Sequence, residues 1–468
     1  MTKRSFYGIM LLASIVVTLG SCLGHDDDYV YYDDAAITSF TLTAANEYTT
    51  TTGSDGKVST TKTELTPSSY RFHINQVSRE IYNTDSLPSG TDSKHILVSI
   101  VTKMGGTIYL KSMKSDSLSV YSSNDSIDFS QPRTFYVLSH SGKVRSQYLV
   151  KVNVHRQDGE KTGWSTPGTA EPAKDYTEGM KMAAVGGRMF LFGNNGTATE
   201  GCATDLADGK TWTPLTPNIE GGLDAEAYKS LTAQGEKLYI LSSGKLYSSA
   251  DGENWDEVAT TTMKQLLGAT PSHLYALTAE GTIETSDDGG KTWTAEQVDG
   301  DASMLPTRDI SLCYNKLVTN ENAYQVIIIG NGDDDNPSKA RIWGKIEEND
   351  EYAQPGAWTS LGDYDGNRYP APALSGLHTV AYDKGFIALG GQGLGTFEAE
   401  PFGNIYKSVD GGLSWRTDHG MTLPTEFSFT GDTFAMTADD ANNIWIVCGQ
   451  SGQVWRGRLN RLGWDEND

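Results

Sequence analysis

Six copies of one strand pattern follow residue 164, and this internal repeat constrains the fold more than any other feature of the sequence. In each copy an apolar strand is followed by a turn and a short alternating strand. The apolar strands are residues 188–192, 237–241, 273–277, 325–329, 385–389 and 443–447, and the alternating strands are residues 201–205, 244–248, 281–285, 340–344, 403–407 and 452–456. A tryptophan closes each copy, at Trp212, Trp255, Trp293, Trp358, Trp415 and Trp464. Six units of four strands predict a six-bladed β-propeller, in which each small sheet packs against its two neighbours.

The turn before four of these tryptophans carries an acidic motif. Two copies fit the pattern S-x-D-x-G-x-[ST]-W in full, namely Ser286, Asp288, Gly290 and Trp293, and Ser408, Asp410, Gly412 and Trp415. Two further copies, Asp208 to Trp212 and Asp251 to Trp255, are one residue shorter. In such a turn glycine supplies a positive φ, while the Asp and Ser oxygens accept backbone N–H groups. The motif resembles the Asp-box of BNR-type, sialidase-like β-propellers, and the resemblance implies a structural role for the aspartates.

The propeller also needs a strand that closes its ring. Residues 163–166, Gly-Trp-Ser-Thr, resemble residues 357–360, Ala-Trp-Thr-Ser, which open the outer strand of the fourth repeat. We therefore expect residues 163–166 to complete the last blade.

A second folded region precedes the repeats. All ten tryptophans lie at or after Trp164, so the composition changes near residue 158, and we place a domain boundary there. The propeller then takes residues 158–468. Between residues 37 and 157 several short segments alternate apolar and polar residues, among them residues 37–42, 95–101 and 148–154. This period of two predicts a β-sandwich. The last segment resembles the closing strand of cadherin-like and immunoglobulin-like modules, which commonly act as spacers.

The first 36 residues predict an export signal and a tether. Lys3 and Arg4 precede an apolar run over residues 6–19, which is shorter than the roughly 20 residues that span a bilayer, so a transmembrane helix is the less favoured alternative. The run ends in Leu-Gly-Ser-Cys, which resembles the bacterial lipobox. That resemblance implies a signal peptide over residues 1–21 and lipidation of Cys22. The acidic tether, residues 22–36, is similar to the export signal of Bacteroidota-type lipoproteins, which implies an outer-membrane protein facing the extracellular side.

The charge and the cysteines exclude some classes of function. Lys and Arg number 37 against 60 Asp and Glu, giving a formal net charge of −23, and such a field repels phosphate backbones. We expect no nucleic-acid partner, and contact with a membrane only through the lipid anchor. The remaining cysteines, Cys202, Cys313 and Cys448, are too scattered for a disulfide framework or a zinc site with close ligand pairs. Cys313 and Cys448 are expected to be buried, whereas Cys202, next to a turn, is open to exposure.

The loops that enter each repeat offer a candidate ligand face. In a propeller these loops, together with those between the second and third strands, crowd one face around the central channel. The polar residues that we nominate there are Glu226, Arg308, Asp309, Arg368 and Tyr369. No catalytic residue, metal site or cofactor is expected. The calcium-like run at residues 363–367 lacks a Glu at its twelfth position, where Leu374 stands.

The chain as a whole resembles surface lipoproteins of gut Bacteroidota with a β-sandwich and an Asp-box propeller. The leading hypothesis is a non-enzymatic binding or scaffold protein whose propeller face engages a glycan, peptide or protein. One alternative is a sialidase-like glycoside hydrolase or lyase, in which Arg188, Arg308 and Arg368 clamp a carboxylate, but the Phe/Tyr-Arg-Ile-Pro motif of sialidases does not occur in the sequence. A second alternative is an assembly factor for an outer-membrane complex, similar to the Asp-box propellers that help assemble photosystems.

Overall fold

The computed structural model describes residues 32–52, 57–350, 356–364, 366–427, 429 and 433–464. Contacts between Cα atoms divide the chain into two compact units, one ending at Gln157 and one running from Asp158 to Asn467. The signal peptide, Cys22 and most of the tether that the sequence predicts lie outside the described residues. Within the described ranges, no helix has the length and apolar character that crossing a membrane requires.

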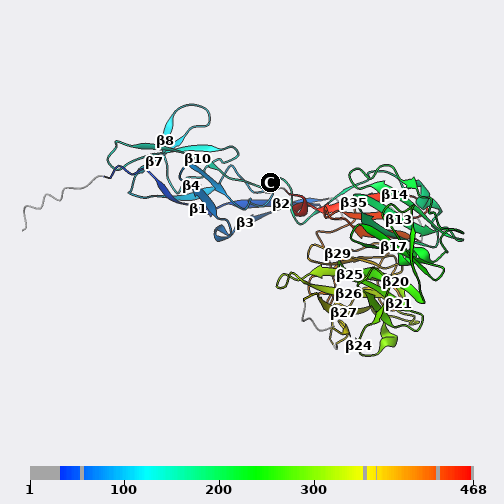
Figure 1. Ribbon diagram of the computed structural model, residues 1–468. Coiled ribbons are helices and arrows are strands. Elements are labelled where there is room, and N and C mark those ends of the chain that lie inside the picture. The colour runs from blue at the N-terminus through cyan, green and yellow to red at the C-terminus, as the bar shows by residue number, and fades with distance from the viewer. Residues whose placement is uncertain are drawn as a thin grey trace, which may run out of the picture. The chain divides into compact units, whose positions relative to one another are not determined.

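The first unit contains two facing sheets and a hairpin (Figure 1). In the smaller sheet β1 (Ile37–Ala44) pairs antiparallel with β6 (Leu97–Thr102). The larger sheet has the order β4 (Phe72–Asn75), β5 (Glu80–Asn83), β10 (Arg145–Lys151), β9 (Arg133–Leu138), β7 (Thr107–Lys111) and β8 (Leu118–Val120). Neighbours in it are antiparallel except β5 and β10. The hairpin joins β2 (Asn46–Thr52) to β3 (Val58–Glu64), and the short 3-10 helix η2 (Pro67–Ser69) comes after it.

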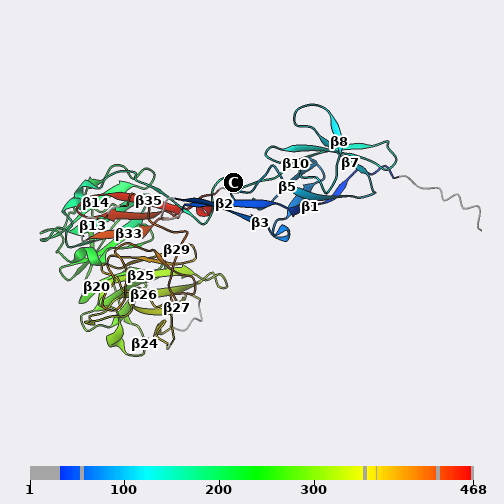
Figure 2. The ribbon, with the colours of Figure 1, turned by 180° about the vertical axis from the view of Figure 1, so that it is seen from behind.

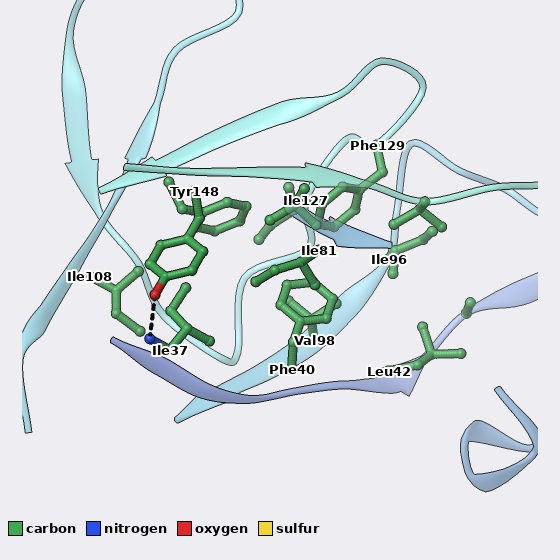
Figure 3. Packing of buried hydrophobic residues seen from close by; sticks show 14 of the residues in the cluster. Ile37, Phe40, Leu42, Ile81, Ile96, Val98, Ile108, Ile127, Phe129 and Tyr148 are labelled. Atoms are coloured by element: carbon green, nitrogen blue, oxygen red, sulfur yellow. Dashed lines mark hydrogen bonds between the residues drawn. The ribbon is translucent and has the colours of Figure 1, made fainter. Parts of the chain in front are cut away.

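Alternating side chains explain why these two sheets pack face to face. Phe135 and Val137 on β9 are fully buried, whereas the residues between them and beside them are partly exposed. The buried side chains meet Ile37 and other apolar residues of β1 in one core (Figure 3). Within this core the Tyr148 hydroxyl accepts a hydrogen bond from the Ile37 backbone N–H at 3.2 Å and donates one to Gln76 Oε1 at 2.8 Å. The first unit is therefore a β-sandwich whose buried hydroxyl group is paired.

The second unit consists of six small sheets among the described residues. The first three are four-stranded and antiparallel, with strands in chain order. Blade 1 contains β12 (Gly179–Val185), β13 (Arg188–Asn194), β14 (Thr199–Asp205) and β15 (Thr213–Pro214). Blade 2 contains β16 (Thr232–Gln234), β17 (Lys237–Ser242), β18 (Lys245–Ser249) and β19 (Asp256–Thr260), and blade 3 contains β20 (Met263–Ala269), β21 (Leu274–Thr278), β22 (Ile283–Ser286) and β23 (Thr294–Ala295).

The remaining blades share the same plan, except that blade 4 has one extra strand and blade 6 takes its outer strand from the start of the unit. Blade 4 contains β25 (Arg308–Lys316), β26 (Ala323–Asn331), β27 (Arg341–Glu348) and β28 (Trp358–Ser360), and β24 (Val298–Asp299) adds a fifth strand parallel to β28. Blade 5 contains β29 (His378–Tyr382), β30 (Gly385–Leu389), β31 (Tyr406–Ser408) and β32 (Arg416–Thr417). Blade 6 contains β33 (Phe434–Ala438), β34 (Ile444–Cys448) and β35 (Val454–Leu459), completed by β11 (Thr162–Ser165). Views from both sides show β25, β26 and β27 next to one another (Figures 1 and 2).

The blades form a closed ring. Their first strands, β12, β16, β20, β25, β29 and β33, each contact the first strand of the next blade, and β33 contacts β12. Six apolar clusters lie around the ring, and each is built mainly from two neighbouring blades. The predicted all-β fold with a β-propeller is confirmed. Four short 3-10 helices adjoin the blades among the described residues: η3 (Glu171–Asp175) before blade 1, η4 (Ala227–Ser230) before blade 2, η5 (Ala302–Met304) before β25 and η6 (Asn460–Gly463) after β35.

The outer strand of blade 6 comes from the start of the unit. Trp164 pairs with Gly457 and Ser165 with Arg456 in an antiparallel ladder, and the Trp164 indole N–H donates to the Thr422 carbonyl at 2.8 Å. The sequence pattern treats Trp464 as the outer-strand tryptophan of this blade, and that is wrong. After β35 the chain turns into η6, and β11 already occupies the outer edge.

The turns between the third and fourth strands are held by their own side chains. The Ser286 hydroxyl donates to Asp288 Oδ1 at 2.8 Å and accepts the Gly290 backbone N–H at 2.8 Å. Asp288 also accepts the backbone N–H groups of residues 291 and 292, and the Trp293 indole donates to the Gly290 carbonyl at 3.1 Å. The turn from Ser408 to Trp415 repeats this pattern around Asp410. The carboxylates are therefore engaged in shaping the turns.

The two shorter copies differ from each other. Asp251 accepts two backbone N–H groups of its turn, and the Trp255 indole donates to the Gly252 carbonyl at 2.8 Å. In the copy at Asp208, the carboxylate accepts the Lys210 backbone N–H at 3.0 Å.

The cysteines of the propeller are packing residues. Cys202, Cys313 and Cys448 are free, and each lies in a cluster between two blades. Burial raises the pKa of each thiol to about 12. The expectation that Cys202 is open to exposure is wrong, because it lies inside β14 opposite Leu191 and is fully buried.

Candidate functional site

Strands of blades 1, 3, 4 and 5, together with η4, bring polar groups together at one end of the ring centre, where propellers have a channel. We call this region the ring mouth and define it by Lys181, Gln265, Asp309, Asn331 and His378. Lys181 lies on β12, Gln265 on β20, Asp309 on β25, Asn331 at the end of β26 and His378 at the start of β29. The residues come from four blades, so the ring has to close before the site exists.

Lys181 brings a positive charge to the ring mouth. Its ammonium group donates to the Lys229 carbonyl of η4 at 3.1 Å, and the Gln265 side-chain amide donates to the same carbonyl at 3.3 Å. No ion pair among the described residues includes Lys181. Desolvation lowers the pKa of Lys181 to about 8, although part of its side chain keeps solvent-accessible area. Lys181 is therefore largely desolvated but keeps some exposure to solvent.

His378 stands on the other side of the ring mouth. Its Nδ1 lies 2.9 Å from the Gly376 carbonyl oxygen, and its ring centroid lies 4.5 Å from that of Phe434. Desolvation lowers its pKa, while hydrogen bonds to the backbone of Gly376 and Met180 act in the opposite direction. The imidazole is therefore neutral at pH 7 and offers polar ring atoms rather than a charge.

Asp309 sits in a strained part of the backbone. Its φ is +53°, a left-handed value for a residue that is not glycine, and the register of β25 against β26 shifts between Arg308 and Ser311. The Asp309 carboxylate accepts a hydrogen bond from Asn331 Nδ2 at 2.7 Å, and that amide nitrogen also donates to the Leu374 carbonyl at 2.8 Å. Asn331 is 1% exposed, and its Oδ1 has no hydrogen-bond partner among the described residues. Strain and an unsatisfied acceptor next to an exposed carboxylate are typical of binding sites.

The structure divides the nominated residues into two groups. Glu226 lies just before η4, where it pairs with Lys229, and Arg308 and Asp309 begin β25. Tyr369 lies elsewhere: its ring lies under the Arg416 guanidinium at 4.4 Å, and its carbonyl accepts the Trp415 backbone N–H at 2.9 Å. Tyr369, and with it the adjacent exposed Arg368, thus lies at the outer strand of blade 5. No described contact links these two residues with Asp309.

The three arginines proposed for a carboxylate clamp do not converge. Arg308 donates to the Gly332 carbonyl at 2.7 Å and lies 3.4 Å from Asp333. Arg188 begins β13, where its guanidinium lies 5.0 Å from the Phe190 ring. Arg368 is on the outer side of blade 5, next to Tyr369. Among the described residues, the arrangement that a sialidase needs is therefore missing from the nominated set.

A second polar cluster lies between blades 3 and 4, and it is closed to ligands. Glu347 is 4% exposed and Tyr275 fully buried. The Tyr275 hydroxyl donates to Glu347 Oε2 at 2.5 Å, the Thr270 hydroxyl lies 2.9 Å from the same oxygen, and His273 Nδ1 lies 3.3 Å from Oε1. Burial opposes ionisation of Glu347, but the hydrogen bonds from Tyr275, Asn349 and Thr270, together with the nearby His273 ring, outweigh it and lower its pKa to about 2. The cluster therefore has a structural role, because its hydrogen bonds connect blade 3 to blade 4.

The sequence pattern does not reveal the centre of the ring mouth. Lys181, Gln265 and Asn331 are absent from the nominated residues, and nothing in the repeat singles out His378. One signal is present, because Lys181 is the only charged residue in residues 179–185, Gly-Met-Lys-Met-Ala-Ala-Val. A lysine in an otherwise apolar strand marks a place where the strand faces water or a ligand.

A closed ring of six blades behind a β-sandwich defines a two-domain all-β protein with a C-terminal propeller. The chain belongs to the DUF6242 family: residues 158–467 match the DUF6242 beta propeller domain, and residues 40–152 match the DUF6242 N-terminal domain.

Several solved structures are similar to this chain at low sequence identity. A structural genomics protein from Bacteroides thetaiotaomicron VPI-5482 is 14% identical, with a TM-score of 0.38 over 78% of this chain and 94% of that one. YCF48 from Cyanidioschyzon merolae is 15% identical, with a TM-score of 0.31 over 63% and 98%. The SapL1 lectin, solved with alpha methyl fucoside, is 12% identical, with a TM-score of 0.33 over 58% and 90%. The comparison with curated proteins gave no match. Likenesses this distant do not identify a ligand.

Proposed function

We propose that this protein is a non-enzymatic binding protein of the cell surface, held in the outer membrane by a lipid on Cys22, whose propeller takes a glycan, peptide or protein at the ring mouth. The observation that carries the proposal is that several polar groups at the ring mouth lack partners among the described residues. The Lys181 ammonium has no ionic partner among the described residues, the buried Asn331 Oδ1 has no donor there, and Asp309 is exposed in a strained conformation. Groups left unsatisfied in this way are stabilised when a ligand supplies their partners.

The Asp-box turns lie outside this proposal. Their carboxylates are saturated by hydrogen bonds within the turn, as for Asp288 and Asp410. The arginines nominated for a clamp are also engaged or far apart. These contacts favour binding over sialidase-like hydrolysis, which needs a carboxylate clamp beside a nucleophile and an acid.

The proposal is tested by binding of the full chain, purified in detergent, to arrays of glycans, peptides and host proteins. We expect at least one ligand to bind the wild type and to be lost with Asp309→Asn, while Asp208→Asn, in an outer turn, leaves binding unchanged. A chain that binds nothing on such arrays contradicts the proposal. Release of sugar by the wild type would favour the hydrolase alternative, and a membrane complex that co-purifies with the chain would favour the assembly factor.

The surface location has its own experiment. Incorporation of a labelled fatty acid into the wild type but not into Cys22→Ser supports the anchor. Digestion of the protein by protease added to intact cells supports the extracellular side. A protein that is protected from protease in intact cells and becomes sensitive after lysis contradicts that side.

A further inference from the structure

Lys345 and Lys407 of the propeller are largely buried and each pairs with a carboxylate, whereas Lys181 does not. Lys345, 5% exposed at its side chain, lies 2.5 Å from Glu296, and Lys407, 15% exposed, lies 2.7 Å from Asp383. Each of these ammonium groups is neutralised inside the protein. The Lys181 ammonium has one carbonyl contact, and no ion pair includes it among the described residues.

This difference is unexpected in a chain with 60 Asp and Glu residues against 37 Lys and Arg. Enclosing an ammonium group without a carboxylate is unfavourable, because part of its hydration is lost and one hydrogen bond replaces it. Apolar side chains flank Lys181 on its strand, and Met180 and Met182 are buried. A neutral residue at this position would pack there at lower cost, so stability does not account for the lysine.

The neighbours of Lys181 fit an anion with further polar groups. The Gln265 amide is a neutral donor that shares the Lys229 carbonyl with the Lys181 ammonium. His378 begins β29, which contacts β25, the strand that carries Asp309, and the charges of Asp309 and Lys181 act on the His378 pKa in opposite directions. Beyond it the unpartnered Asn331 Oδ1 requires a donor. A ligand that suits all of these groups has an anionic group for Lys181 and an O–H or N–H group for the Asn331 and Asp309 oxygens.

We propose that the ring mouth recognises its ligand through a carboxylate group that pairs with Lys181, while hydroxyl or amide N–H groups of the same ligand donate to Asn331 and Asp309. This inference rests on the proposed function, because it specifies the ligand of the same site. A carboxylate next to such donors occurs in acidic sugars and at the C-terminus of a peptide. The net charge of −23 disfavours anionic ligands in general, so Lys181, which forms no ion pair among the described residues, provides selectivity for an anionic ligand that can reach it.

The test compares matched pairs of probes by calorimetry with the full chain in detergent. One arm uses methyl glucuronide against methyl glucoside, and the other a tripeptide with a free C-terminal carboxylate against its C-terminal amide. In at least one arm we expect the carboxylate to bind ten-fold or more tightly than its neutral partner. Lys181→Met should abolish that difference and Lys181→Arg should keep most of it. Lys264→Met, at an exposed lysine on β20 in blade 3, is the matched control and should bind as the wild type does.

The outcomes distinguish a failure of this inference from a failure of the proposed binding function. Equal binding of carboxylate and neutral probes overturns the inference and leaves a binding function intact. Failure of both carboxylate probes to bind also overturns it, and binding of neutral glycans on the arrays then decides the proposed function alone. Thermal unfolding distinguishes a structural lysine: if Lys181→Met loses carboxylate binding and also melts well below the wild type, the loss reflects unfolding and counts against the proposal. The proposal requires a melting temperature at or above that of the wild type.

Discussion

Replacing Glu347 by Gln tests whether a buried charge holds blades 3 and 4 together. The carboxylate is 4% exposed and is surrounded by donors from blade 3 and from its own strand end. Its pKa is lowered from 4.5 to about 2, which corresponds to about 3 kcal/mol of unfolding free energy, since each pKa unit is worth about 1.4 kcal/mol. We expect Glu347→Gln to lower the unfolding free energy by about that amount at pH 7.

The sign of the pH dependence comes from the direction of the pKa change. A carboxylate with a depressed pKa stabilises the folded state fully above its unfolded pKa of 4.5, and this contribution is lost as the pH falls toward the folded value of about 2. The difference in unfolding free energy between the wild type and Glu347→Gln should therefore be largest above about pH 5 and shrink steadily between pH 4.5 and about 2.

The assay can be restricted to the propeller. All ten tryptophans lie at or after Trp164, so indole fluorescence during urea unfolding reports on the second unit, and Trp358 packs edge-to-face on Tyr275 at 5.8 Å, beside the cluster. Glu348→Gln, an exposed neighbour, is the control and should change stability by less than about 0.5 kcal/mol. If the gap between wild type and Glu347→Gln stays constant from pH 6 to pH 3, the ionised carboxylate is not the source of the stability, and the reasoning fails.

Three further predictions concern packing. Trp164→Ala should lower the unfolding free energy by about 2 kcal/mol, which is less than for a fully buried tryptophan because the ring is half-exposed. Urea unfolding measures this change, and an unchanged midpoint would show that the Trp164 contacts of the closing strand do not stabilise the propeller. Gly290→Ala should cost about 2 kcal/mol more than Gly281→Ala, because both glycines have positive φ but only at Gly290 would a Cβ meet the Leu246 side chain; equal melting temperatures would refute the steric argument. The three propeller thiols should resist alkylation at pH 8 in the folded chain and all react in urea, as mass spectrometry would show.

The blades are predictable because a repeated pattern needs no long-range information. Each second strand is an apolar run of residues buried on both sides, as in β21 and β34, and turn residues after each one fix where it ends. The closing strand is also predictable, because residues 163–166 resemble another outer strand. Trp464 is misplaced by the pattern because the repeat spacing continues past β35, while the outer edge of blade 6 belongs to a strand from the other end of the unit.

The ring mouth is only partly predictable because it is assembled across the ring. Lys181 and His378 are almost 200 residues apart, and their proximity depends on closure and not on any local pattern. The segment over residues 366–377 shows a second limit to prediction from the sequence. Tyr369 contacts the outer part of blade 5, whereas the Leu374 carbonyl meets Asn331 at the ring mouth. This loop thus runs from the outer strand of blade 5 to the ring mouth, and no feature of the sequence marks which of its residues lie at the outer strand and which at the ring mouth.

Because β11 closes the ring, the order in which the strands emerge during synthesis determines when the ring can close. Ser165 and Arg456 pair although they are 291 residues apart, so a chain that emerges from its N-terminal end carries β11 without a partner until nearly the whole propeller has emerged. During that interval the ring is an open arc with unpaired strand edges, which attract other chains. Such a long-range pairing is slow to form. Because β35 is the last strand in chain order and the partner of β11, the ring closes around the ring mouth only after nearly all of the propeller has emerged.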